Sequence, residues 1–295
     1  MSTISSQPTA EKLTLKFGNV TVDLSVKRIG ILYHPELEKA KALVAELEEL
    51  LSTRKISCWH CSAWDEDEAR RQVAGSDLIL SIGGDGTILH SARAIIPRSV
   101  PLMGINLGQL GFIAELNAAE ALSRLPGVIN GEGWLDDRAM LEADVDGKSL
   151  HALNDVVLRS SIARLIPITA KIDGEELTTY PADGVVVASA TGSTGYSLAV
   201  GGPVLHPQSR QMILTPIACH LGLNRALVLS PESVVELSID EGGKATFSLD
   251  GQVNLPFKEG QTATVKISPH ATHFLRIHPP AYFYSTLWQK LKGKG

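Results

Sequence analysis

The first half of the chain alternates short apolar runs with segments of helical periodicity. The run 29–32 predicts a buried strand, and apolar residues recur three and four positions apart over 43–51, as they do in a helix. Further apolar strands are predicted at 56–61, 77–82 and 100–105. Strands that alternate with helices predict a Rossmann-like α/β domain, in which a parallel sheet carries helices on both faces.

The pattern changes to a period of two near Trp134. Apolar and polar residues alternate over 141–145, 168–172, 235–239, 245–249 and 263–267. Turns such as Asp146-Gly147 and Asp173-Gly174 lie between these segments. Period-two strands joined by Gly-containing turns predict an all-β, antiparallel, β-sandwich-like domain.

The two ends of the chain add smaller elements. Alternating residues at 13–17 and 20–24 flank Gly18-Asn19 and predict a β-hairpin with a tight turn. Apolar residues over 282–291 predict a final helix.

The length of the chain fits a two-domain organisation. The chain has 295 residues, with 44% hydrophobic and 20% charged residues, which is ordinary for a folded globular protein. The predicted division is an α/β domain of residues 1–135 plus 278–295 and a β-rich domain of residues 136–277.

Charge, hydropathy and cysteine content argue against several classes of protein. The formal net charge is -5 without a Lys/Arg block, so we expect no nucleic-acid partner. No apolar run approaches the roughly 20 residues of a membrane span, and we expect no membrane partner and a cytoplasmic location. The three cysteines fit a reducing compartment. The C-x-x-C segment 58–61 lacks a second ligand pair for zinc, and we interpret it as part of a strand.

The segment most informative about chemistry is Gly83-Gly84-Asp85-Gly86-Thr87. It follows a predicted strand and precedes the helical spacing of residues 88–95. A Gly-rich turn between strand and helix directs backbone N–H groups and a positive helix end toward an anion such as phosphate. Asp85 in this setting suits a general base that takes the proton of an attacking hydroxyl, or a group that helps hold a metal. The alternative is a plain tight turn, since Asp and Gly are common there.

This loop resembles that of a kinase superfamily that includes NAD kinases, diacylglycerol and sphingosine kinases and, more distantly, phosphofructokinases. Later segments distinguish among them. They are Asn106-Leu107-Gly108-Gln109-Leu110-Gly111-Phe112, Asn154-Asp155, Asp183-Gly184, Thr191-Gly192-Ser193-Thr194-Gly195-Tyr196-Ser197 and Asp250-Gly251-Gln252. In this order and spacing they resemble the NAD kinase family over roughly residues 28 to 290.

The resemblance implies transfer of phosphate from ATP to the 2′-hydroxyl of the adenosine ribose of NAD, with Asp85 as general base. It also implies Mg²⁺ or another divalent metal and a homo-oligomer, either dimer or tetramer. The implied binding residues are Gly83, Gly84, Gly86 and Thr87 in the loop, Phe112 at the pocket wall, Asn154 and Asp155 at the adenosine, Arg164 at a phosphate, Asp183, Thr191, Thr194, Gly195, Tyr196 and Ser197 at the adenine and nicotinamide ribose, and Gln252 at the nicotinamide end.

Two positions depart from the common family pattern, because many members carry Glu at Asp155 and Ala at Gly195. Two other functions stay open on the sequence alone. One is a lipid kinase of the diacylglycerol or sphingosine kinase type, and the other is a sensor that binds NAD(P) without turnover. The range of phosphoryl donors, ATP or polyphosphate, and the preference for NAD or NADH stay open as well.

Overall fold

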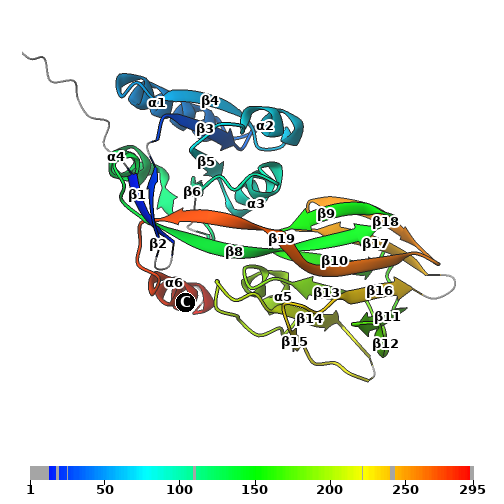
Figure 1. Ribbon diagram of the computed structural model, residues 1–295. Coiled ribbons are helices and arrows are strands. Elements are labelled where there is room, and N and C mark those ends of the chain that lie inside the picture. The colour runs from blue at the N-terminus through cyan, green and yellow to red at the C-terminus, as the bar shows by residue number, and fades with distance from the viewer. Residues whose placement is uncertain are drawn as a thin grey trace, which may run out of the picture. The chain divides into compact units, whose positions relative to one another are not determined.

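The computed structural model describes residues 13–17, 20–24, 26–108, 111–220, 222–239 and 243–292. The chain divides into two compact units, one of residues 1–136 with 273–295 and the other of residues 137–272 (Figure 1). Strands β8 (Trp134–Val145) and β19 (Thr262–Arg276) carry the chain from one unit to the other.

A parallel sheet forms the middle of the α/β unit. Its strands are β3 (Arg28–Tyr33), β4 (Ser57–Ser62), β5 (Leu78–Gly83), β6 (Leu102–Asn106) and the short β7 (Leu116–Asn117). They lie in the order β4-β3-β5-β6-β7, and every one of these pairs is parallel. The predicted parallel sheet is thereby confirmed.

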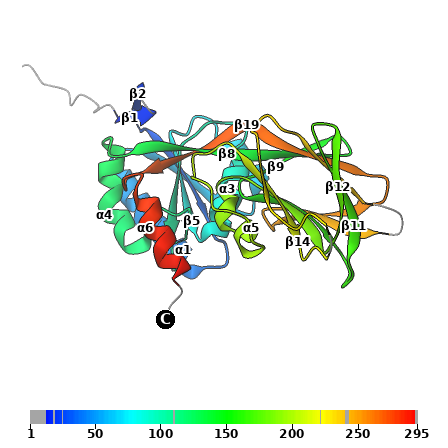
Figure 2. The ribbon, with the colours of Figure 1, turned by 90° about the horizontal axis from the view of Figure 1, so that it is seen from below.

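Helices cover both faces of this sheet. They are α1 (Glu38–Thr53), α2 (Glu66–Gln72), α3 (Asp85–Ala94) and α4 (Ala118–Ile129). The last helix of the unit, α6 (Tyr282–Leu291), is drawn in red in Figures 1 and 2. Leu47 of α1 and Leu125 of α4 share one core with Leu80 of β5. Ser81, the next residue of β5, faces the opposite way and accepts a hydrogen bond from Ser91 of α3 at 2.8 Å. No helix within the described residues is long and apolar enough to cross a membrane.

The two smaller sequence predictions in this unit agree with the structure. Strands β1 (Leu13–Phe17) and β2 (Val20–Leu24) pair antiparallel as a hairpin, whose predicted turn residues Gly18-Asn19 lie outside the described residues. Cys58 and Cys61 lie within β4 and are free. Burial raises the pKa of Cys58 to about 11 and that of Cys61 to about 12, so both thiols stay protonated at neutral pH.

The second unit consists of two sheets with antiparallel pairing. The first runs β9 (Lys148–Ala152), β8, β19, β16 (Val235–Ile239), β11 (Ile166–Ile172) and β12 (Glu175–Ala182). The second runs β15 (Leu227–Leu229), β14 (Met212–Ile217), β13 (Gly184–Ala188), β10 (Asp155–Ser160), β17 (Lys244–Leu249) and β18 (Val253–Lys258).

One core joins the two sheets. Ile168 and Leu237 of the first sheet are buried in the same cluster as Val187 and Phe247 of the second. Two sheets that face each other across a shared core form a β-sandwich, as the period-two pattern predicts. The burial of this core explains why the polar residues of each strand alternate with apolar ones.

Asp-Gly turns close three of the hairpins in this unit. Both residues of Asp146-Gly147, Asp173-Gly174 and Asp250-Gly251 have positive φ angles, between 52° and 86°. Two consecutive residues of this kind form a type I′ turn, whose twist matches that of the flanking strands. The first two turns confirm the sequence prediction, and the third places Asp250 beside the start of β10.

Candidate active site

The Gly-rich loop joins β5 to α3 at the carboxyl end of the parallel strands. Gly84 is the N-cap residue of α3, with an extended backbone at φ −105° and ψ −174°, and Asp85 begins the helix. A side chain added at Gly84 would meet no atom within 4 Å, so a ligand has open access to its backbone. The first turn of a helix presents N–H groups and a positive dipole end, which together favour an anion.

A cavity of about 480 Å³ lies beside this loop. Its walls are Glu36, Leu37, Glu38 and Lys39 before and within the first turn of α1, Gly83 and Gly84 of the loop, and Asn106, Leu107 and Gly108 after β6. Open α/β sheets bind ligands at the carboxyl ends of their strands, where this cavity lies.

The Asp85 carboxylate is held in one orientation by the segment that follows β6. Its Oδ2 accepts the N–H of Phe112 at 2.9 Å, and its Oδ1 accepts the N–H of Ile113 at 3.4 Å. A Cβ atom on Gly111 would lie 1.7 Å from Oδ1, so only glycine leaves room for the carboxylate there. The structure therefore fixes a carboxylate at the start of α3.

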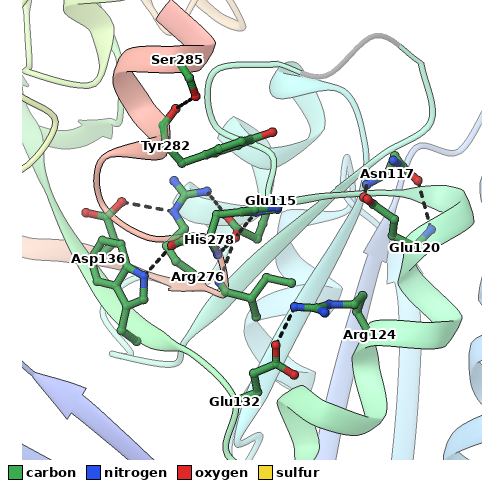
Figure 3. A network of polar contacts seen from close by, with 12 residues as sticks. Glu115, Asn117, Glu120, Arg124, Glu132, Asp136, Arg276, His278, Tyr282 and Ser285 are labelled. Carbon is green, nitrogen blue, oxygen red and sulfur yellow. Dashed lines mark hydrogen bonds and ion pairs between the residues drawn. The ribbon is translucent and has the colours of Figure 1, made fainter.

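A buried ionic network supports that segment from the other side (Figure 3). The Nη1 of Arg276 donates to the carbonyl oxygen of Ile113 at 2.6 Å, which is the same residue whose N–H binds Asp85. Arg276 also forms ion pairs with Glu115 at 3.3 Å and with Asp136 at 3.2 Å. All three charged side chains are at most 7% exposed, so they retain little hydration.

Glu115 extends the network to the last helix. Its Oε1 accepts hydrogen bonds from the backbone N–H of Ile277 and His278 and from Nδ1 of His278, at 2.7 to 2.8 Å. The ring of Tyr282, at the start of α6, stacks on the His278 ring with 4.2 Å between centroids (Figure 3). The segment that holds Asp85 is thus connected to the beginning of α6.

Thr87 lies in the core beneath the loop. Its side chain is 1% exposed, and its Oγ1 would lie 2.1 Å from a Cβ atom on Gly83. The hydroxyl therefore packs against β5, and Gly83 is required because Thr87 takes the space of its side chain. Gly86, in contrast, is exposed.

A second cluster forms in the β-sandwich unit around Asp250. The Asp250 carboxylate accepts the backbone N–H groups of Leu153, Asn154 and Asp155 at 3.0, 2.7 and 3.2 Å, and its own N–H donates to the Asp155 carbonyl at 2.9 Å. These bonds tie the β17–β18 turn, which also contains the half-buried Gln252, to the start of β10.

The side chains of Asn154 and Asp155 have hydrogen-bonding properties that suit a ligand. Asp155 is 6% exposed, and burial together with the nearby charge of Asp250 raises its pKa to about 7. The Oδ1 of Asn154 is buried and has no hydrogen-bond partner among the described residues. A buried acceptor without a partner is costly, and a ligand N–H group would relieve that cost.

The loop after β13 lies against these two residues. Ser189 donates its N–H to the Asn154 carbonyl at 2.9 Å and its hydroxyl to the Leu153 carbonyl at 2.5 Å. A Cβ atom on Gly195 would lie 3.7 Å from Nδ2 of Asn154 and 3.9 Å from Oδ2 of Asp155. The structure therefore brings together Asn154, Asp155 and Gly195, as the sequence suggests.

The remaining residues of this loop differ in their access to a ligand. Thr191 is the N-cap residue of the 3-10 helix Gly192–Thr194, and the Thr191 hydroxyl accepts a hydrogen bond from Nη1 of Arg138 at 3.4 Å. Thr191 and Ser197 are buried, whereas Tyr196, at the start of α5 (Tyr196–Ala199), is 40% exposed. Thr194 is half-buried, so a ligand reaches Thr194 and Tyr196 more readily than Thr191 or Ser197.

Arg164 and Asp183 lie apart from this cluster within the same unit. Both are exposed, and the carbonyl of Asp183 accepts the N–H of Ser160, the last residue of β10. Asn154 directly precedes the first residue of β10. A strand rises about 3.3 Å per residue, so β10 separates the two groups by roughly 16 Å or more.

No group of three or more His, Cys, Asp and Glu side chains that could hold a metal occurs within the described ranges. Mg²⁺ is usually held by one or two carboxylates together with the phosphates of a nucleotide. Glu36 and Glu38 in the cavity wall are carboxylates of that kind, so the residues present fit a metal that arrives with a nucleotide.

Several residues of the site carry no signal that identifies their function from the sequence. The segments around Gly111 and Asp250 stand out as motifs, but their contacts with Asp85 and with residues 153–155 appear only in the fold. Arg276 has no local signal, because its ion-pair partners Glu115 and Asp136 are 161 and 140 positions away.

A Gly-rich strand-to-helix loop with a fixed carboxylate, in an α/β unit followed by a β-sandwich, defines a phosphotransferase of the Gly-Gly-Asp-Gly class. Residues 18–133 match the ATP-NAD kinase N-terminal domain family, and residues 153–277 match the ATP-NAD kinase C-terminal domain family. The chain belongs to the ATP-NAD kinase family, as its motifs suggest.

Individual relatives agree with this assignment. The chain is 43% identical over 274 residues to the NAD kinase of Dehalococcoides mccartyi, covering 90% of this chain and 96% of that one. It is 37% identical over 273 residues to the NAD kinase of Chloroflexus aggregans, covering 90% and 99%. Both comparisons span nearly the whole length of the relatives.

Solved structures share the fold. Yeast NADH kinase complexed with NADH matches with a TM-score of 0.78 at 22% identity, covering 98% of this chain and 96% of that chain. An NAD kinase from Archaeoglobus fulgidus in complex with ATP matches with a TM-score of 0.73 at 25% identity, covering 91% and 100%. These likenesses confirm the predicted combination of an α/β domain and an antiparallel β domain.

Proposed function

We propose that this ATP-dependent NAD kinase uses Asp85 as its general base. The 2′-hydroxyl of the adenosine ribose loses its proton to Asp85, a bond forms between that oxygen and the γ-phosphorus of ATP, and the bond to the bridging oxygen breaks, leaving ADP and NADP. The observation that carries this proposal is the Asp85 carboxylate, held by the N–H groups of Phe112 and Ile113 at the start of the phosphate-binding helix.

The phosphates of ATP occupy the cavity beside the loop. The backbone of Gly83, Gly84 and Gly86 and the positive end of α3 stabilise their negative charge. Glu36 and Glu38 would hold Mg²⁺ together with the phosphates, and the metal would supply further positive charge. Phosphoryl transfer depends mainly on such positioning and charge neutralisation, which this arrangement provides.

The adenosine half of NAD binds in the sandwich unit at Asn154 and Asp155. The buried Oδ1 of Asn154 accepts an N–H of adenine, and its amide nitrogen donates to a ring nitrogen. Asp155, with a pKa of about 7, accepts or donates hydrogen bonds to the ribose. Thr194, Gly195 and Tyr196 complete the surface for the adenine and the nicotinamide ribose, with Gln252 toward the nicotinamide end. Phe112 lines the pocket wall in the α/β unit.

We also propose that the enzyme is a homo-oligomer in which one subunit completes the NAD pocket of another. Asp183 and Arg164 are exposed and lie at the opposite end of β10 from Asn154, so they are a strand length away from an adenine bound at Asn154 of their own sandwich. A neighbouring copy supplies them instead. The cytoplasmic location stays a prediction.

The test measures NADP formation from NAD, ATP and Mg²⁺ with a coupled NADP-specific dehydrogenase. Asp85→Asn lowers kcat by about 10²–10⁴-fold, since general-base help is worth that much. The variant retains NAD binding by isothermal titration, because Asn154 and Asp155 are intact. Asp67→Asn, at an exposed position in α2, serves as the matched control and keeps wild-type kcat.

Two outcomes contradict separate parts of the proposal. A wild-type kcat in the Asp85→Asn enzyme would contradict the proposed role of Asp85 as general base. A folded wild-type protein that binds NAD but forms no NADP, with NADH and polyphosphate also offered, supports the sensor alternative. The family assignment removes the lipid-kinase alternative, because both family domains match NAD kinases.

A further inference from the structure

The last helix brings a cation to the residue that holds Asp85. The Nζ of Lys290 lies 4.2 Å from the centroid of the Phe112 ring. The backbone N–H of Phe112 donates to Oδ2 of Asp85 at 2.9 Å. One residue of the loop after β6 therefore contacts the general base through its backbone and an ammonium group through its ring.

The helix that carries Lys290 is attached to the same segment at its beginning. His278 binds Glu115, and Tyr282 stacks on His278 (Figure 3). Thr286, one turn further along α6, is buried. Lys290 thus lies against Phe112 near the end of α6, and His278, just before the helix, binds Glu115 of the same segment.

The ammonium group has an unusual environment for a lysine. No carboxylate in the described parts of the chain forms an ion pair with Lys290, and its side chain is half-buried. Burial lowers its pKa, while the charge of Asp85 acts in the opposite direction. A partly desolvated cation on an aromatic face interacts more strongly with an added anion than a fully hydrated one does.

We propose that Lys290 belongs to the phosphoryl-transfer site and contacts the phosphates of the bound ATP through its ammonium group. The transferred group carries negative charge on its non-bridging oxygens, and the Asp85 carboxylate beside it adds more. Lys290 supplies a full positive charge at this place, which the partial charges of backbone N–H groups do not match. This inference rests on the proposed function of the 83–87 loop and of Asp85.

The test compares Lys290→Met, which removes the charge and keeps the length, with Lys290→Arg, which keeps the charge. Inorganic pyrophosphate is the probe, measured as an inhibitor competitive with ATP. Lys290→Met weakens pyrophosphate inhibition and lowers kcat/KM for ATP, each by about 10- to 100-fold. Loss of one hydrogen bond to a charged group changes an affinity by about this factor. Lys290→Arg restores most of both, and the KM for NAD changes little.

Lys292 provides a matched control at the end of the same helix. Its Nζ lies 4.8 Å from the Trp288 ring, and it is exposed, so it shares the charge and the aromatic contact without the connection to Asp85. Lys292→Met keeps pyrophosphate inhibition within about twofold of wild type, as expected of an exposed charge. Thermal unfolding of all variants identifies any loss of folding, and Lys290→Gln is the second neutral variant should the Met variant unfold.

Unchanged pyrophosphate inhibition in a folded Lys290→Met or Lys290→Gln enzyme overturns the inference. A rise in the KM for NAD with unchanged pyrophosphate inhibition also overturns it, because it would show that Lys290 only supports the fold. Asp85→Asn in the same series separates the two proposals. If Asp85→Asn is inactive and Lys290→Met behaves like wild type, only the proposed role of Lys290 is rejected. If Asp85→Asn is active, the proposed role of Asp85 as general base is rejected.

Discussion

Two glycines of the loop after β13 meet different constraints. A Cβ atom on Gly192 would lie 1.9 Å from the Asn154 carbonyl oxygen, whereas on Gly195 the nearest atom would be the Gly192 carbonyl oxygen at 3.3 Å. The first contact is impossible without moving the backbone. The second needs a shift of only a few tenths of an ångström.

Gly192→Ala should therefore destabilise the fold by about 2 kcal/mol or more and weaken NAD binding, because Asn154 must move. Gly195→Ala should stay within about 1 kcal/mol of wild type and serves as the matched control. Urea unfolding and NAD titration measure both effects. Equal effects of the two substitutions would contradict the close approach of Gly192 to Asn154.

Asp155 links the stability of the protein to pH. Its pKa is raised from 3.8 to about 7, so the folded state holds a proton that the unfolded chain releases between these values. Folding stability contributed by this group is therefore present below about pH 4 and is lost as the pH rises to 7.

Asp155→Asn removes this dependence, since an amide does not titrate. The free energy of unfolding of the variant should rise relative to wild type by on the order of 1 kcal/mol per pH unit between pH 4 and 7 and then level off. Urea unfolding from pH 4 to 8.5 measures the difference. A difference that is constant with pH would show that Asp155 is ionised in the folded protein.

At the scale of elements, the position of Asp85 depends on how the 111–115 segment is fixed between α3 and β19. Asp85 binds the segment from the side of α3, and Arg276 at the end of β19 binds it from the other side. The Asp85 carboxylate is thus oriented by backbone groups whose own position depends on a buried ionic network. Such a network is costly to break because the remaining charges stay buried.

Arg276→Met should destabilise the protein by about 3–5 kcal/mol, because Glu115 and Asp136 then stay buried without the guanidinium group. Arg124, which pairs with Glu132 at the surface with both side chains more than 40% exposed, is the matched control (Figure 3). Arg124→Met should cost about 0–1 kcal/mol. Urea unfolding measures the free energy of unfolding of both variants. Similar losses of stability would contradict the claim that burial makes the Arg276 network costly to break.

At the scale of the whole molecule, the proposed oligomer requires Asp85 and Asp183 of one active site to come from different subunits. Mixing inactive Asp85→Asn and Asp183→Ala subunits should then restore activity. In a mixed dimer one of the two sites has both residues intact, so random mixing in equal amounts recovers roughly a quarter of wild-type activity. The coupled NADP assay after dissociation and reassociation measures this recovery.

The control mixture combines Asp85→Asn with Asn154→Leu, two residues proposed to serve the site from the same subunit. In a mixed dimer one site then lacks Asp85 and the other lacks Asn154. No site is intact, so the activity of the mixture should not exceed that of the two inactive variants. Failure of the Asp183→Ala mixture to recover, in oligomers shown to be mixed, contradicts the shared pocket. A fully active monomer contradicts it as well.

The sequence by itself determines the two fold classes and the position of the loop around Asp85. The period of two after Trp134 and the helical spacing before it are local properties, so they predict strands and helices without knowledge of the fold. The same holds for the Asp146-Gly147 and Asp173-Gly174 turns, whose backbone angles depend on two residues. The strand and helix on either side of residues 83–87 likewise predict a phosphate-binding loop.

Only the tertiary structure decides which side chains meet. Asp250 binds the N–H groups of residues 153–155, and Arg276 reaches Ile113 across most of the chain, because the path of the backbone brings them together. It also turns Thr87 into the core and separates Asp183 from Asn154 by the length of a strand. Periodicity and motifs describe neighbours in sequence, whereas hydrogen bonds and burial depend on neighbours in space.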